Sequence, residues 1–306
     1  MSAPQTITQH PDLLDRRFSR IFDNTYQATP EMRSKLFTVQ TARRGADEKF
    51  SNLGEIGDLV PFTGTFQYDS SAQGYDVTAT HLEFGKGMAI TRKMRDYDLF
   101  GKMDLQPQKL GRATQRTQEG HAARIFTMAF SNDTLFYSHS EGVPLCSNSH
   151  TTTASGVSTA SGFDNLGTAA LSAVAVASAR IQMKGFRGDV GQIISCMPDE
   201  LWYPTGLYET AWEIVNSMGK VDDVVNNANV QRNAWKLYEW QYMSDANDWF
   251  MCDSMMRKEN LFWFNSVAPE FAKTGDFDTM DWKWRVYTRY SYLYNDWRWI
   301  MGHSVS

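Results

Sequence analysis

The amino-acid sequence predicts an α+β fold, in which helical and strand-like stretches occupy separate parts of the chain. Two observations support this fold class. Apolar residues recur at helical spacing over 11–26 and 107–130. They alternate with polar residues over 59–84 and 282–294, as in strands that are buried on one face only. The predicted order is an arm, a hairpin, a long helix, a mixed domain and a final long strand.

Charge is distributed unevenly along the 306 residues. The chain has 30 Lys and Arg against 35 Asp and Glu, a net charge of −5, so bulk attraction to nucleic acid is excluded. Residues 86–124 hold nine basic and four acidic side chains, whereas residues 199–306 hold ten basic and sixteen acidic ones. Any contact with a polyanion must therefore come from a local basic patch. The aromatic content of 13% excludes a disordered chain.

The cysteines and the N-terminus bear on the compartment. Cys146, Cys196 and Cys252 are about fifty residues apart and form no Cys-x-x-Cys pair, which favours a reducing environment. The N-terminus lacks a basic-then-apolar signal pattern, and the longest run of small residues, 169–179, is too short to span a bilayer. We therefore expect a soluble protein that is not exported and has no membrane partner.

The first strand-like region predicts a β-hairpin over 59–84, after an amphipathic helix at 11–26. Turn residues at 69–74 separate its two strands. A two-stranded ribbon is marginal in water unless another element covers its apolar face. The hairpin therefore needs a partner. The side chains predicted to make this contact are Val60, Phe62, Phe66, Tyr68, Tyr75 and Val77.

The long helix predicted at 107–130 carries a basic stripe at spacings of three, four and eight residues. Two interpretations stay open: the stripe faces DNA or a neighbouring subunit, or it is a solvated face paired with nearby acidic side chains. The stripe consists of Lys109, Arg112, Arg116 and Arg124.

The rest of the chain predicts shorter elements. A helix is expected to begin after Asp164 or Asn165 and to end at Gly185, and another helix is expected at 205–218. The expected strands are a buried one at 191–197, three short ones at 234–243, 249–253 and 261–267, and the clearest one at 282–294.

No catalytic, metal or cofactor motif is found. Ser138, His139 and His150 lie in one region, but no Gly-x-Ser-x-Gly elbow accompanies them. Cys146 and His150 supply two metal ligands at most, whereas a structural zinc site needs four. Gly85-Lys-Gly87 is too short for a phosphate loop. We expect no cofactor, although the rows of aromatic residues leave open a platform that binds carbohydrate.

Three passages, in order, resemble a known family. They are Pro144-Leu-Cys-Ser-Asn-Ser-His150 followed by Gly162-Phe-Asp-Asn165 and an alanine-rich helix; Met197-Pro-Asp-Glu-Leu201 leading to Ala211; and 226–229 through 237–240 to 244–250. With the order of elements, they are similar to the major capsid proteins of tailed bacteriophages, which have the Hong Kong 97-type fold.

The resemblance implies a domain organisation. The N-terminal arm would be 1–55 and the extended loop, a β-hairpin, 56–88. The partner that covers this hairpin would be the neighbouring subunit, so its six contact side chains would make an intersubunit contact. The peripheral domain with its long spine helix would be 89–130 and 276–306, and the axial domain 131–275.

The resemblance also implies a function. The chain would be a non-enzymatic major capsid protein, located in the virion and assembled in the bacterial host cytoplasm. Its hexamers and pentamers would form an icosahedral shell around double-stranded DNA, with a separate scaffolding protein, a portal and a decoration protein as further partners. Because 59–84 contains no lysine, we expect no isopeptide crosslink from the loop. The alternative is a soluble enzyme or binding protein that uses the Trp- and Tyr-rich C-terminal half on carbohydrate.

Overall fold

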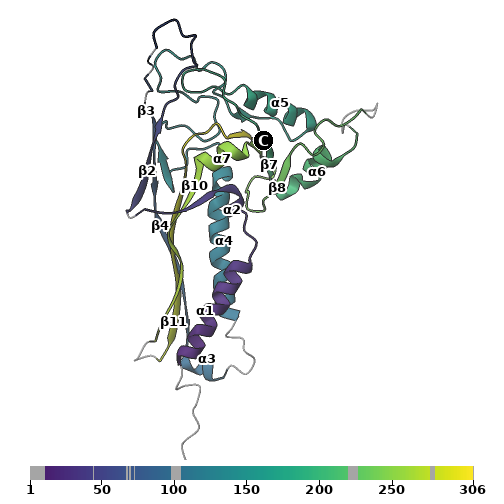
Figure 1. Ribbon diagram of the computed structural model, residues 1–306. Coiled ribbons are helices and arrows are strands. Elements are labelled where there is room, and N and C mark those ends of the chain that lie inside the picture. Colours follow the sequence, from purple (N-terminus) through teal and green to yellow (C-terminus); the bar gives the residue numbers. More distant parts are fainter. Residues whose placement is uncertain are drawn as a thin grey trace, which may run out of the picture.

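The computed structural model describes residues 11–43, 45–66, 68, 70–71, 73–97, 105–219, 227–275 and 280–305. The molecule is elongated: a body containing most of the strands continues into a long projection of sheet and helices (Figure 1). Both helical and strand regions are present in separate layers, as the predicted α+β class requires.

The projection contains a four-stranded sheet in the order β1-β10-β11-β4. β10 (Leu261–Gly275) and β11 (Trp282–Tyr294) form a long antiparallel hairpin, and β4 (Leu82–Ile90) pairs with the outer edge of β11. β1 (Thr38–Thr41) adds in parallel to the start of β10. β11 has the bounds predicted for the final strand, although an unpredicted strand, β12 (Ile300–His303), follows it. The strand predicted at 261–267 is twice as long as expected. A domain boundary at 275/276 would cut through this hairpin.

Two helices cover one face of the sheet. α1 (Pro11–Ala28) packs along α4 (Leu105–Thr127), and the two predicted helices are thereby confirmed. Phe18 meets Trp284 edge-on with ring centroids 5.5 Å apart, and Phe22 stacks on Phe271 at 5.3 Å. Gly111 permits this close approach, because a Cβ there would lie 3.2 Å from the Phe22 carbonyl oxygen. The short helices α2 (Arg33–Leu36) and α3 (Arg92–Asp96) lie between α1 and α4 in the sequence.

The predicted hairpin is present with a different first strand. β2 (Asp47–Leu53), not 59–68, pairs with β3 (Gln73–Thr80), and β5 (Tyr137–His139) completes a three-stranded sheet. The period-two pattern at 59–68 was misleading, because those residues belong to an irregular loop with no strand beside it in the described structure. Also, β3 is followed by β4, which joins a different sheet, so the hairpin does not extend to residue 84.

A five-stranded sheet forms the centre of the body, in the order β6-β12-β9-β7-β8. Its strands are β6 (Leu166–Gly167), β12 (Ile300–His303), β9 (Trp249–Cys252), β7 (Glu200–Tyr203) and β8 (Lys236–Glu239). The accompanying helices are α5 (Ala173–Lys184), the 3₁₀ turn η3 (Thr205–Leu207), α6 (Tyr208–Asn216) and α7 (Ser254–Asn260). Because β12 belongs to this sheet, the segment 276–306 is not wholly part of the projection.

Two local predictions in this region were wrong. α5 begins after Ser172, whose hydroxyl accepts the Ala175 N–H as an N-cap, and not after Asp164 or Asn165. The segment 191–197 forms only one isolated bridge, between Arg187 and Ile193, because the central sheet takes its strands from elsewhere.

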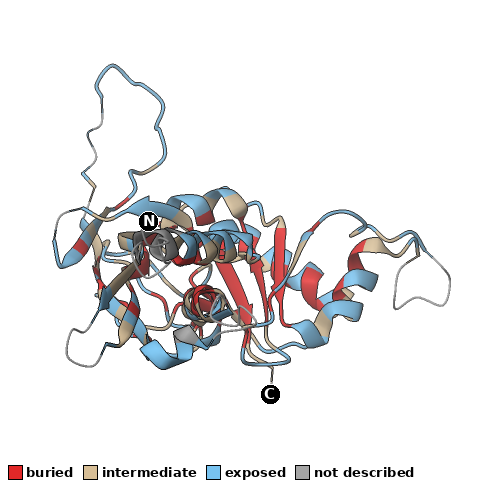
Figure 2. Ribbon diagram, turned by 90° about the horizontal axis from the view of Figure 1, so that it is seen from below, coloured by how far each residue is buried: buried red, intermediate tan, exposed pale blue. Residues whose placement is uncertain are grey.

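The aromatic residues fill the interior. Eight of the ten tryptophans are buried, and the fully buried rings include Trp202, Trp249 and Trp263. The ribbon coloured by burial shows buried residues along the central strands (Figure 2). Alternating aromatic rows therefore form a core and not an exposed carbohydrate platform. The prediction that they form a carbohydrate-binding platform is therefore wrong for these buried rings.

A buried histidine predicts acid sensitivity. His303 stacks on Trp249 with centroids 3.9 Å apart, and burial lowers its pKa to about 4. The folded-state pKa of His303 is thus below the unfolded value of 6.5. Above pH 6.5 the imidazole is neutral in both states and its contribution to the unfolding free energy is complete. As the pH falls toward 4 the unfolded state binds the proton first, so that contribution is lost. Between pH 7.5 and 4.5, this residue should account for about 2 to 3 kcal/mol of lost unfolding free energy. Urea unfolding of His303→Phe, which keeps the stacking, should show a loss smaller by that amount; an equal loss would refute the assignment.

Candidate assembly interface

Leu59 and Tyr68, the two most exposed large apolar side chains of the described residues, lie in the segment 54–72. From here on we restrict the name extended loop to 54–72, because the rest of the predicted 56–88 belongs mainly to β3 and β4. The extended loop joins the end of β2 to the start of β3 and stands away from the body (Figures 1 and 2). Leu59 is fully exposed and Tyr68 is 95% exposed. Phe62 and Phe66 contact each other, with centroids 4.9 Å apart, yet both stay exposed. A single soluble subunit gains nothing from such a patch, so the loop has the character of a docking surface.

The six predicted contact residues divide into three groups. Val60, Phe62, Phe66 and Tyr68 are exposed. Tyr75 is half-buried, and its hydroxyl contacts Thr151 Oγ1 at 2.5 Å. Val77 is fully buried, because it lies in β3 between β2 and β5. The prediction was therefore wrong for Val77, which stabilises its own subunit.

The base of the extended loop is held by a charged cluster. Glu55 accepts a hydrogen bond from Gln192 Nε2, and burial raises the pKa of Glu55 while Arg298 opposes that rise. Arg298 forms ion pairs with Asp189 at 2.8 Å and Asp296 at 2.9 Å. Burial disfavours the Arg298 charge, but the two carboxylates raise the pKa of its guanidinium. This cluster fixes the direction in which the loop leaves the body.

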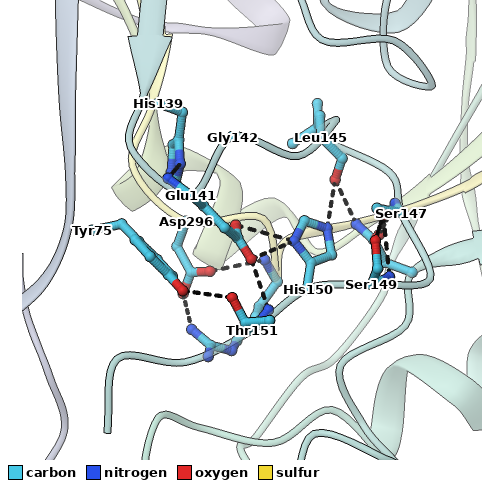
Figure 3. A network of polar contacts seen from close by, with 12 residues as sticks. Tyr75, His139, Glu141, Gly142, Leu145, Ser147, Ser149, His150, Thr151 and Asp296 are labelled. Atoms are coloured by element: carbon cyan, nitrogen blue, oxygen red, sulfur yellow. Dashed lines mark hydrogen bonds and ion pairs between the residues drawn. The ribbon is translucent and has the colours of Figure 1, made fainter.

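A second polar network lies directly beside this cluster (Figure 3). His150 Nδ1 lies 3.1 Å from Glu141 Oε1, and both side chains are almost fully buried. The imidazole stacks on Trp297 with centroids 4.2 Å apart, and the Thr151 N–H donates to Glu141 Oε1 at 2.8 Å. Since Thr151 also contacts the Tyr75 hydroxyl, the network ties β3 to the 141–151 segment. His150 is a structural residue here, with both ring nitrogens facing oxygen atoms.

The motif residues that suggested a family come together in space. Asn165 is fully buried and accepts the Ser147 N–H at 2.8 Å. Its amide also donates to the carbonyl oxygens of Leu145 at 2.9 Å and Ile300 at 3.1 Å. One asparagine thus joins two separated motif segments to β12.

The basic stripe is divided by the structure. Lys109, Arg112 and Arg116 are exposed on α4. Arg124 instead forms a two-pronged ion pair with Asp133, at 2.8 and 2.9 Å, and hydrogen bonding to that carboxylate raises the pKa of Arg124. The interpretation as a paired basic face therefore holds for Arg124, and only the other three remain candidates for an external anion.

The described residues show no group of three His, Cys, Asp or Glu side chains placed to hold a metal ion. The three cysteines are free and buried, and burial raises the pKa of Cys196 to about 12, so its thiol stays protonated. None of the helices in the described ranges combines the length and hydropathy that crossing a bilayer requires.

A comparison with known protein families shows which family has this arrangement of sheets and helices. The family described as phage capsid protein matches residues 74–301, which run from β3 to β12. The chain belongs to this family. The capsid protein family match covers the five-stranded sheet and the buried Asn165, whereas α1, β1, β2 and the whole extended loop lie outside it. Comparison with curated proteins finds no match.

Solved structures agree on the fold of this phage capsid protein. It is similar to the capsid of a native GTA particle, with a TM-score of 0.57, 10% identity, and 91% of this chain and 92% of that chain covered. It is also similar to the mature capsid of bacteriophage PhiM1, with a TM-score of 0.57, 8% identity and coverage of 91% and 88%. It is similar to the bacteriophage JBD30 capsid too, with a TM-score of 0.55, 15% identity, and 71% of this chain and 92% of that chain covered. The predicted Hong Kong 97-type fold is confirmed.

Proposed function

We propose that this capsid protein is the major head protein of a tailed bacteriophage and that it assembles into the hexamers and pentamers of an icosahedral shell. The observation that carries the proposal is the extended loop, whose exposed apolar residues are held away from the subunit by a rigid base. Burying one such side chain against a neighbour contributes about 1.5 to 3 kcal/mol. A shell of identical subunits repeats this contact many times, so it can close although no single contact is tight.

The test is the size of the particles that the expressed protein forms. Negative-stain microscopy and light scattering should show particles of capsid dimensions when the chain is made alone or with the other head proteins of its phage. A stable monomer whose melting temperature rises with added oligosaccharide would instead favour the carbohydrate-directed alternative and contradict the proposal.

We further propose that the shell encloses double-stranded DNA and that Lys109, Arg112 and Arg116 face it. The three side chains are exposed on one helix, which suits nonspecific contact with phosphates. A separate scaffolding protein, a portal and a decoration protein complete the proposed set of partners. In this proposal assembly takes place in the host cytoplasm, and the role is structural, not enzymatic.

Replacing Arg112 and Arg116 by Gln should lower DNA retention in filled particles while empty shells still form. The physical reason is counterion release: the variant makes fewer phosphate contacts, so its DNA retention should depend less on salt, and its difference from the wild type should shrink as the salt concentration is raised. DNA content per particle is measured at several salt concentrations, with the double variant Lys35→Gln and Lys258→Gln as the control, since it removes two exposed cations from α2 and α7 and none from α4. Equal retention in normally assembled shells would reject DNA contact.

Mature shells should be held together by noncovalent contacts only. Residues 59–84 contain no lysine, and Lys86 lies on β4 opposite Val286, beside the groove between β4 and α4. Boiling purified particles in detergent and reductant should release one band near 34.9 kDa. A ladder of resistant multimers, with an isopeptide bond mapped to Lys86, would contradict this prediction.

A further inference from the structure

α5 presents an apolar stripe to solvent beside two basic side chains. Its inner face, which includes Val176, Ala179 and Met183, fills the core. On the outer face Val174 is 62% and Ile181 is 71% exposed, although both are large aliphatic residues. The side chains of Arg180 and Lys184, one turn apart, border this stripe and are also exposed. We call this surface the α5 stripe.

α6 presents a similar stripe beside charges of the opposite sign. Its inner face, with Ala211, Ile214 and Val215, packs into the core. Tyr208 and Trp212, one turn apart, are each about half exposed. Exposed Glu209 and Glu213 border them at the same spacing. We call this surface the α6 stripe. Among the tryptophans of the described residues, Trp212 is the most exposed.

The two stripes are complementary in their apolar character and in their charge. Each has an apolar centre and a charged border, the usual anatomy of a protein interface, and one border is basic while the other is acidic. Within the described part of the chain, no hydrogen bond or ion pair engages the charged ends of Arg180, Lys184, Glu209 or Glu213. The four charges are thus available to a partner. Both helices belong to the part of the molecule built around the five-stranded sheet (Figure 1).

We propose that the α5 stripe of one subunit packs against the α6 stripe of the next subunit in the same ring. This inference rests on the proposed function, since it names a contact inside the capsomer. A closed ring of identical chains requires a head-to-tail interface, in which two different surfaces of each copy meet. The opposite charges of the two stripes fit such a contact, whereas either stripe facing a copy of itself would bring like charges together. The occupant of each stripe is therefore a second copy of this chain.

Charge exchange tests the contact directly. One variant carries Arg180→Glu and Lys184→Glu, a second carries Glu209→Lys and Glu213→Lys, and a third carries all four changes. Because a reversed border places like charges opposite each other, each two-site variant should lower the yield of particles by about tenfold or more. The four-site variant restores opposite charges and should return the yield to within about twofold of the wild type.

Two controls keep the outcomes distinct. Lys35→Glu with Lys258→Glu makes the same net-charge change as the variant with Arg180→Glu and Lys184→Glu, but at exposed sites on α2 and α7, and it should assemble as the wild type does. Circular dichroism and urea unfolding establish that each variant subunit is folded. Normal particle yields from either two-site variant would overturn the α5–α6 contact. A four-site variant with yields as low as those of the two-site variants would overturn it as well. In both cases wild-type shells would still support the proposed function. Absence of wild-type particles would instead overturn the proposed function itself.

Discussion

A chain whose extended loop is replaced by a short Gly-Ser turn should fold and fail to assemble. Leu53 and Gln73 are directly opposite each other in the β2–β3 pairing, so a turn can join the two strands without moving them. Removing residues 56–71 takes away the exposed apolar side chains and leaves Val77 and Ala79 in the core. Size-exclusion chromatography with light scattering should show a monomer or a small oligomer and no particles.

The matched control keeps the length of the loop and changes polar positions only. Thr63→Ser with Thr65→Ser leaves the apolar side chains in place and should assemble normally. A deletion of the whole predicted hairpin, 59–84, should instead give an unfolded protein, because it removes β3 and the start of β4. Shells of normal size from the short-turn variant would show that the loop is not an assembly contact.

Removing the charge of Arg257 should destabilise the subunit by about 3 to 5 kcal/mol. Arg257 and Glu200 form a buried ion pair, with the two nitrogen atoms 2.8 and 2.9 Å from the carboxylate oxygens. Arg257 also donates to the Leu36 carbonyl oxygen, so it connects the N-terminal region to the central sheet. In Arg257→Met the Glu200 carboxylate stays buried without its partner, which is the costly state. Urea unfolding of the variant measures the loss.

Combining Arg257→Met with Glu200→Gln should recover a large part of that stability. The amide removes the unpaired charge and keeps an oxygen that can accept the Trp202 indole N–H, which donates to Glu200 at 3.0 Å. Lys258→Met, at the adjacent exposed position, should change the unfolding free energy by no more than about 0.5 kcal/mol. A loss below about 1 kcal/mol in Arg257→Met would mean that the pair is not a buried anchor.

The sequence was sufficient for elements whose burial pattern is regular. α1 and α4 bury one face along several turns, and β11 alternates inward aromatic rings with outward polar residues, so their periods are those of a helix and a strand. β2 was missed because its sequence, Asp-Glu-Lys-Phe-Ser-Asn-Leu, is mostly polar and only Phe50 and Glu48 point inward among its central residues. Its strand conformation comes from pairing with β3, which is tertiary information.

The assembly surfaces could be predicted only in part, for a related reason. Alternation at 59–68 signals apolar side chains that need cover, but it does not tell whether the cover belongs to the same chain or to another. Val77 and Phe66 have the same pattern and opposite environments. In the basic stripe, the pairing of Arg124 depends on Asp133 after the end of α4, where the chain direction changes and helical spacing no longer applies. The stripes on α5 and α6 were not found from sequence, because their inner and outer faces are both apolar.

The parallel pairing of β1 with β10 affects how the chain must be made. Thr38 pairs with Phe262, more than 200 residues later. Translation at about 5 to 20 residues per second separates the appearance of these two strands by roughly 10 to 45 seconds. During that interval β1 has no partner in this sheet, and the strand that flanks β4 has not yet been synthesised. Contacts this distant in sequence make folding slow and place its completion after synthesis. Only a finished chain can therefore offer a complete set of assembly surfaces, which limits the joining of partial subunits to a growing shell.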